Sequence, residues 1–171
     1  MIRVLRNADD RSRFRSGDPD IDRFFHKYAG QNQFRQHIGV TYVAEDSEGT
    51  IVGFCTISVG TIEGEALPQT VRKKLPSYPL PVLRLARLGV DEQAQGAGLG
   101  GTLLAFALRL ALRLSEEYGC LGVVVDAKPG AVAFYEKFGF RSLATLEGEL
   151  ADRPPATPMF LSIGEIRAAI N

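Results

Sequence analysis

The sequence has few cysteines, no excess of charge of either sign and no long apolar run. Its two cysteines, Cys55 and Cys120, have no second cysteine or histidine close by, which excludes a zinc-type spacing and favours buried, reduced thiols over a disulfide. Twenty basic and twenty acidic residues cancel, so net charge points to neither a nucleic acid nor a membrane. No segment approaches the roughly 20 apolar residues of a membrane span, and no signal-peptide core is present. We therefore expect a cytoplasmic protein.

The 171 residues show no repeat and no low-complexity segment, which predicts a single domain over residues 1–171. The pattern of apolar residues predicts the order β-α-β-β-β-α-β-α-β-β-α and an α/β (α+β) fold class. Strands are expected at 1–6, 40–46, 50–63, 82–91, 120–127, 141–150 and from 159, with helices at 16–37, 98–119, 128–139 and up to 170. Loops are expected at 64–81, with one helical turn, and at 153–158.

Two of these elements carry further expectations. In the helix at 16–37, Asp18 is a good N-cap and Pro19 fits the first helical position. Gly30 weakens the helical pattern, so we expect a break there. The strand at 82–91 is apolar at successive positions, which suggests burial on both of its faces.

The most informative stretch is "DEQAQGAGLGG", where a strand leads into a long helix. Glycine weakens both elements, so four glycines at this junction indicate that something approaches the main chain closely. A loop that opens a helix presents unpaired N–H groups and the positive end of the helix dipole, where a phosphate can bind. A tight turn that only lets strand and helix pack closely is the alternative.

Two phosphate-binding motifs can be excluded. A P-loop needs a lysine after its last glycine, and none follows here. The spacing G-x-G-x-x-G of a dinucleotide fold is present over 96–101, but its acidic residue would fall at 116–117, inside the following helix.

The loop also has the form Q-x-x-G-x-G from Gln95 to Gly100, which resembles the acyl-CoA loop of the GNAT superfamily of N-acetyltransferases. "RLGVDEQAQGAGLGGTLLAFAL" has that superfamily's strand–loop–helix form, and "AVAFYEKFGF" is similar to its later helix and turn. Within the superfamily, nearly all of residues 14–163 resemble the toxins that acetylate aminoacyl-tRNA, through "SGDPDIDRFFHKYAGQNQFRQHIGVTYVAED", "IVGFCTISVGTIE", "LRLARLGVD" and "TPMFLSI". Two departures are Ala97, where many members carry a basic residue, and "AKPGAVAFY", which lacks the usual polar residues.

The resemblance implies a central mixed, mostly antiparallel sheet of six or seven strands, flanked by helices and splayed at the acyl-CoA site. It implies acetyl-CoA as co-substrate, with main-chain groups of residues 88–90 pairing with the pantetheine arm and the loop amides holding the pyrophosphate. The implied cofactor-binding residues are Leu88, Gly89, Val90, Gln95, Gly96, Ala97, Gly98, Leu99, Gly100, Gly101 and Phe134.

The resemblance also makes Tyr135 the candidate general acid for the departing thiolate, because a phenol with a pKa of about 10 keeps its proton at neutral pH. Packing among the neighbouring phenylalanines is the alternative role. An N–H near Val90 would stabilise the oxyanion. No carboxylate stands out as a base, and the four nearest candidates are expected to be solvated turn residues: Glu63, Glu65, Asp91 and Glu92. We expect the two histidines, His26 and His37, on a helix surface.

Basic residues gather locally despite the zero net charge. Residues 1–38 hold eight arginines and lysines against five aspartates, and a second cluster lies at 72–74. Such clusters can follow a phosphate backbone, although a mixed-charge surface is the alternative. With the resemblance, the expected tRNA-binding residues are Arg23, Lys27, Arg84 and Arg87.

The sequence leaves other functions open. One is a GNAT enzyme that acts on a small amine or a protein amino group, and another is an acyl-CoA-binding regulatory module without activity. The expected partners are acetyl-CoA, aminoacyl-tRNA, a ribbon-helix-helix antitoxin and a second copy of the chain, with no metal and no membrane.

Overall fold

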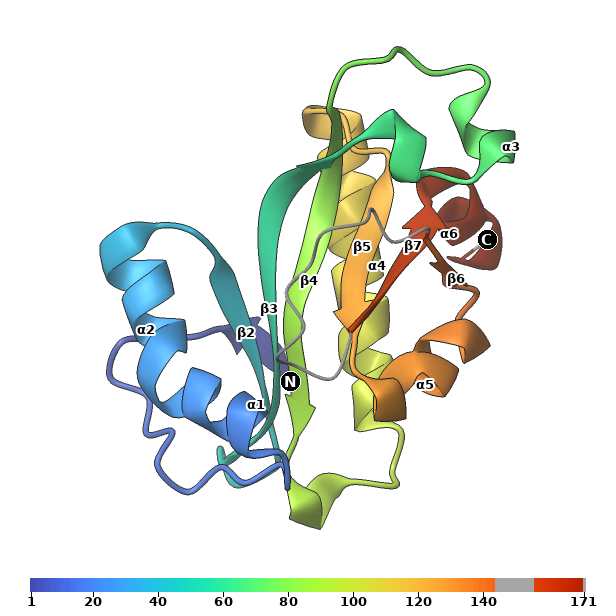
Figure 1. Ribbon diagram of the computed structural model, residues 1–171. Helices are drawn as coiled ribbons and strands as arrows, with labels where there is room; N and C mark the ends of the chain where they lie inside the picture. Colours follow the sequence, from blue (N-terminus) through green and yellow to red (C-terminus); the bar gives the residue numbers. More distant parts are fainter. Residues whose placement is uncertain (144–155, 171) are drawn as a thin grey trace. The chain divides into compact units, whose positions relative to one another are not determined.

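In the computed structural model, which describes residues 1–143 and 156–170, seven strands form one mostly antiparallel sheet flanked by helices (Figure 1). The strand order is β1-β2-β3-β4-β5-β7-β6, which confirms the predicted fold class. The strands are β1 (Ile2–Val4), β2 (Val40–Glu45), β3 (Ile51–Ile62), β4 (Leu80–Val90), β5 (Gly122–Ala127), β6 (Arg141–Ser142) and β7 (Thr157–Ser162). The α-helices are α1 (Pro19–Arg23), α2 (Ala29–Gln31), α3 (Gln69–Arg72), α4 (Leu99–Glu117), α5 (Val132–Lys137) and α6 (Ile163–Ile170).

The chain divides into two compact units. Unit 1 comprises Met1–Ser58 and Leu85–Arg109, and unit 2 comprises Val59–Arg84 and Leu110–Asn171. The chain passes between the units within β3, β4 and α4. A single domain over the whole chain stays a prediction.

The first helical segment of unit 1 begins as predicted. The side chain of Asp18 accepts from the N–H groups of Asp20 and Ile21, and Pro19 occupies the first turn. The predicted break at Gly30 is wrong, because the segment stays helical from Pro19 to Gln36. A side chain at Gly30 would lie 3.0 Å from the Arg11 guanidinium, so this glycine makes room for a long-range contact.

Two π-helical turns, at Phe24–Tyr28 and Asn32–Gln36, interrupt the α-helical geometry of this segment. In each turn the closing N–H donates to a carbonyl five residues earlier, as from Ala29 to Phe24. Buried positions accordingly recur at a spacing of five: 24 with 29, and 25 with 30. The segment ends at His37, whose φ of +56° is left-handed.

The core of unit 1 lies between this helical segment and the sheet, and Figure 1 shows α1 and α2 beside β2 and β3. The rings of Phe25 and Phe54 stack at 4.3 Å, and Phe14 meets both rings edge-on. Tyr42, which alternates with buried Val43 along β2, faces away from this core and contacts Phe106 of α4. The predicted hairpin of β2 and β3 is confirmed, with a bulge at Ala44.

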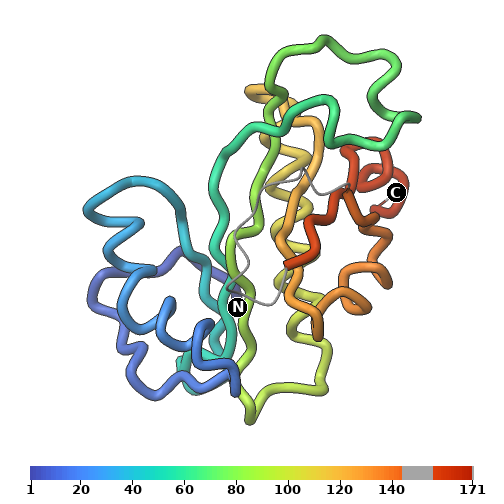
Figure 2. Tube along the Cα trace, viewed as in Figure 1, coloured from blue at the N-terminus to red at the C-terminus, as the bar shows by residue number. Residues whose placement is uncertain are grey.

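In unit 2, the C-terminal strand β7 lies between β5 and β6 and pairs antiparallel with both. Figure 2 shows these segments side by side, in orange and red. Pro158 pairs with Asp126 in this ladder, so the predicted loop at 153–158 is wrong at its end. Most of the strand predicted at 141–150, like the start of that loop, lies outside the described residues. The helical turn predicted within the loop at 64–81 is confirmed by α3, whereas the loop ends earlier than predicted because β4 begins at Leu80.

Burial departs from the predictions at two further places. In β4, Val82, Leu83 and Leu85 are buried, whereas Leu88 and Val90 are only half-buried. Cys55 is fully buried, which raises the pKa of its thiol to about 12, whereas Cys120 is half-buried. Both thiols are free.

Candidate functional site

The glycine loop holds two residues with left-handed backbone. Gly96 has a φ of +85° and Gly98 a φ of +83°, and a side chain at either would meet no atom within 4 Å. These glycines are therefore required by the backbone conformation, and the space above them is open. Residues 95–98 are exposed and 99–101 are half-buried.

The main-chain N–H groups of this loop are available to a ligand. Within the described part of the chain, residues 96–101 donate to no protein acceptor, and the first helical hydrogen bond at this end of α4 runs from Thr102 N to Gly98 O. Open space, unpaired donors and the start of a 19-residue helix together fit a phosphate or pyrophosphate.

The strand that leads into this loop, β4, packs closely against the phenylalanine core at Gly89. At Gly89 a side chain would lie 2.7 Å from Ile21 and 2.8 Å from Phe54, so only glycine fits between β4 and the phenylalanine core. An isolated glycine inside a strand pattern is itself a signal of such an approach. The packing places residues 88–90 against the N-terminal helical segment.

The same N-terminal segment holds the start of the loop. Asp91 accepts from Arg15 N at 3.0 Å and from Gln93 N, and Glu92 N donates to Arg15 O at 2.7 Å. The side-chain amide of Gln95 donates to Ser16 O at 2.8 Å and to Val90 O at 3.0 Å. Asp91 thus has a structural role and is not the solvated turn residue that was expected, and these contacts could not be predicted from the sequence.

Tyr135 lies in unit 2, on α5, and is only 6% exposed. Its ring meets Phe134 at 5.1 Å and Phe140 at 5.4 Å, both edge-on. The predicted aromatic packing is present, and it holds the phenol in a defined place. Helix α5 ends at Lys137, two residues before the predicted end at Gly139, whose φ of +93° is left-handed.

Three of the four predicted acceptor-binding cations belong to unit 1. Arg87 lies over the ring of Phe24, with 5.0 Å between the guanidinium carbon and the ring centre. Phe24 stands next to Arg23 and three residues before Lys27 on the helical segment. The fourth cation, Arg84, belongs to unit 2 and pairs with Asp126 at 3.1 Å.

The remaining candidates have other surroundings. Glu63, Glu65 and Glu92 are exposed, as expected. His26 is less exposed than predicted: it is half-buried, and its Nε2 lies 2.9 Å from Phe14 O. His37 is exposed.

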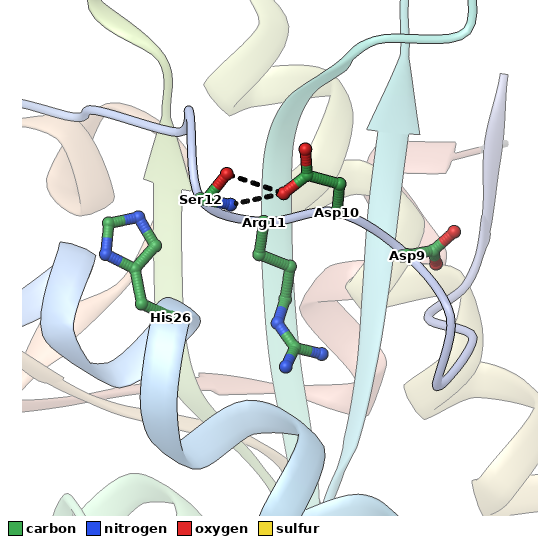
Figure 3. Close-up of a pocket in the computed structure, with 5 residues that line it drawn as sticks. All are labelled: Asp9, Asp10, Arg11, Ser12 and His26. Carbon is green, nitrogen blue, oxygen red and sulfur yellow. Dashed lines mark hydrogen bonds between the residues drawn. The ribbon is translucent and has the colours of Figure 1, made fainter.

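A surface pocket of about 390 Å³ lies elsewhere in unit 1 and contains none of the predicted site residues (Figure 3). Its lining residues are Asp9, Asp10, Arg11, Ser12 and His26. Nε and Nη1 of Arg11 are buried without a hydrogen-bond partner among the described residues.

Over residues 1–143 and 156–170, no group of three or more His, Cys, Asp or Glu side chains is arranged to hold a metal ion. The same residues include no helix with the length and apolar character that crossing a membrane requires.

Comparison with known proteins matches residues 37–142 to the acetyltransferase (GNAT) domain. The chain is 34% identical to a tRNA-acetylating toxin of Mycobacterium tuberculosis, over 81% of this chain and 82% of the relative. Among solved structures, AtaT complexed with acetyl-methionyl-tRNAfMet aligns with a TM-score of 0.84 and 26% identity, covering 100% of this chain and 99% of that one. AtaTR bound with AcCoA aligns with a TM-score of 0.82 and 27% identity, covering 100% and 98%.

Proposed function

Because the chain belongs to the GNAT family of acetyltransferases, we propose that it transfers the acetyl group of acetyl-CoA to the α-amino group of aminoacyl-tRNA. The observation that carries this proposal is the loop of unpaired main-chain donors at residues 96–101, in a chain similar to a tRNA-acetylating toxin. Acetylation turns the amine into an amide, which cannot attack in peptide-bond formation. The protein would then act as a toxin that stops translation, in the cytoplasm where charged tRNA is found.

The residues present fit acetyl-CoA. The amides of residues 96–101 and the start of α4 would hold the pyrophosphate, and the open space above Gly96 and Gly98 admits it. The half-buried main chain of residues 88–90 would pair with the pantetheine arm. Gln95 would contribute its main-chain N–H, because its side chain is already engaged. Ala97 supplies no cation, so binding relies on the main-chain amides.

Tyr135 is the proposed general acid. The departing thiolate needs a proton, and a phenol ordinarily keeps its proton at neutral pH. Phe134 and Phe140 fix the ring edge-on, which fixes the direction of its hydroxyl. A main-chain N–H near Val90 is the proposed donor to the oxyanion, and the α-amine needs no strong base because it titrates near neutrality.

The proposed acceptor surface of unit 1 is formed by Arg23 and Lys27 of the helical segment and by Arg87. Arg84 of unit 2 is proposed separately as a tRNA-binding residue. Cations placed together favour a polyanion such as tRNA over a small amine. The ring of Phe24 holds the Arg87 guanidinium in place through a cation–π contact. The N–H groups at the edge of the guanidinium plane are then available to a phosphate.

Incubation with labelled acetyl-CoA and charged total tRNA tests the proposal directly. We expect the label on the aminoacyl group of tRNA, removable together with the amino acid by mild base. Label on polyamines or on a protein amine, and none on charged tRNA, would contradict the proposed acceptor and leave an acetyltransferase of another substrate. A ribbon-helix-helix antitoxin is proposed as a partner that relieves the toxicity.

A further inference from the structure

The short linker Arg15–Gly17 joins two parts of the proposed site. On one side it enters the helical segment: Ser16 N and Ser16 Oγ both donate to Asp22, at 2.8 and 2.7 Å. On the other side it meets the glycine loop, through the contacts of Asp91, Glu92 N and Gln95. Every main-chain N–H and C=O of Arg15 and Ser16 is thereby hydrogen-bonded.

The contacts of the linker with the loop are short and specific. Asp91 uses one carboxylate oxygen for Arg15 N and the other for Gln93 N, so it fixes both the linker and the first turn of the loop. Gln95 uses one amide nitrogen to join Ser16 O to Val90 O, the last carbonyl of β4. Gly17 has a φ of +90° and leaves room for Glu92. A Cβ atom added at Gly17 would lie 2.9 Å from Oε1 of Glu92.

We infer that Asp91 and Gln95 are positioning residues, which hold the glycine loop against the Arg15–Gly17 linker in the conformation that binds the pyrophosphate. This inference rests on the proposed binding of acetyl-CoA at residues 96–101, and it needs no particular acceptor. Gln95 lies immediately before the left-handed Gly96, and Asp91 stands at the start of the same loop, five residues before Gly96. Together they fix the direction in which the following N–H groups point. Neither side chain touches the ligand itself.

The sign of one effect separates this role from direct contact. Asp91 carries a negative charge at the start of a loop that binds an anion. By direct electrostatics, its removal would tighten the binding of CoA. A positioning role predicts the opposite, because the loop loses its hold on the linker. Asp91→Ala should therefore weaken CoA binding about 10- to 150-fold, the loss expected for hydrogen bonds to a charged group.

Gln95 allows a matched pair of variants. Gln95→Met keeps the length of the side chain and removes both hydrogen bonds, and should weaken CoA binding about three- to tenfold. Gln93→Met makes the same change two residues away, at an exposed side chain with no hydrogen bond of its own among the described contacts, and should leave binding unchanged. Glu48→Ala, at the exposed turn between β2 and β3, controls for the loss of one negative charge.

The experiment measures the dissociation constant of CoA by calorimetry without acceptor, and then kcat and KM for acetyl-CoA. We expect Asp91→Ala and Gln95→Met to raise both the dissociation constant and KM, with kcat at saturation within twofold of wild type. Because both residues act through one linker, the double variant should lose less than the product of the two single effects. Partial unfolding would instead lower kcat and leave the affinity of the folded fraction intact.

Three results would overturn the inference alone: unchanged affinity in both variants, tighter binding by Asp91→Ala, or a fall in kcat at unchanged affinity. The last, with a calorimetric binding stoichiometry equal to that of wild type, would make Asp91 a base, because partial unfolding would lower the stoichiometry as well. A wild-type protein that binds no CoA would overturn the proposed function instead, so the two failures are distinguishable.

Discussion

The guanidinium carbon of Arg87 lies over the ring of Phe24, 5.0 Å from the ring centre. This contact joins a β4 cation to the helical segment that carries Arg23 and Lys27. Arg84, by contrast, is already paired with Asp126.

Charge reversal at Arg87 should therefore weaken the acetylation of charged tRNA more than reversal at Arg84 does. We expect Arg87→Glu to raise KM for charged tRNA by about tenfold or more and to leave the affinity for CoA unchanged. The slope of log KM for charged tRNA against log salt concentration should fall by about one unit. Arg109→Glu, at an exposed arginine on α4, is the control. Equal effects of all three variants would indicate a diffuse charge effect and no defined contact.

Tyr135→Phe should slow acetyl transfer by about 10²- to 10⁴-fold, because it removes only the proposed acidic hydroxyl. The ring contacts with Phe134 and Phe140 remain, so folding and CoA affinity should be retained. Single-turnover kinetics with saturating acetyl-CoA measures the effect. Tyr118→Phe is the control: it changes a tyrosine that is 83% exposed and should leave the rate of acetyl transfer unchanged. An unchanged rate in Tyr135→Phe would limit this residue to packing.

Valine substitutions at the left-handed glycines Gly98 and Gly49 distinguish the effect of backbone strain from the effect on ligand binding. Their φ angles are +83° and +82°, and a side chain at either would meet no atom within 4 Å. Valine at either position should cost about 1–3 kcal/mol of stability through strain. Only Gly98→Val should also abolish CoA binding, because its side chain would fill the open space above the loop. If folded Gly98→Val bound CoA like wild type, the pyrophosphate would have to lie elsewhere.

Arg3 links two carboxylates across the first strands, Asp9 at 2.9 Å and Glu45, and all three side chains are largely buried. The hydrogen bonds from Arg3 lower the pKa of Asp9. A lowered pKa in the folded protein adds stability above the unfolded value of about 3.9, and this stability is lost as the pH falls through the folded pKa.

Asp9→Asn should thus reduce the free energy of unfolding by about 1–3 kcal/mol at pH 7, with the difference from wild type shrinking below about pH 4. Urea denaturation across this pH range provides the measurement. Asp20→Asn breaks an exposed pair with Arg23 and should cost less than about 1 kcal/mol. A constant difference at all pH values would mean that Asp9 acts through packing alone.

Local rules were sufficient for much of the fold. Asp18 and Pro19 begin a helix wherever they precede an apolar pattern, and the left-handed Gly139 ends α5 for an equally local reason. The continuity through Gly30 could not be predicted, because glycine ordinarily weakens a helix, and the Arg11 guanidinium that a side chain here would meet lies nineteen residues earlier in the chain. Likewise the contact of His26 Nε2 with Phe14 O could not be predicted, because Phe14 lies twelve residues earlier in the chain.

The candidate site divides in the same way. The glycine loop was recognisable because its function requires a composition that strands and helices otherwise avoid. The attachment of the loop to the Arg15–Gly17 linker could not be recognised in the sequence. The linker takes part through main-chain atoms, which every residue type possesses. The predicted splay of the sheet at the acyl-CoA site and a second copy of the chain stay predictions.

The π-turns also bear on where this chain can change length. Deleting the exposed Lys27 would shorten the spacing from Phe24 to Ala29 from five residues to four, which returns to the same face of an α-helix. The buried side chains would keep their places in the core. Deleting the exposed Arg113 from α4 would instead turn the rest of that helix by about 100° and bring its polar face inward. Natural one-residue gaps among related sequences should therefore gather at residues 24–36 and avoid α4.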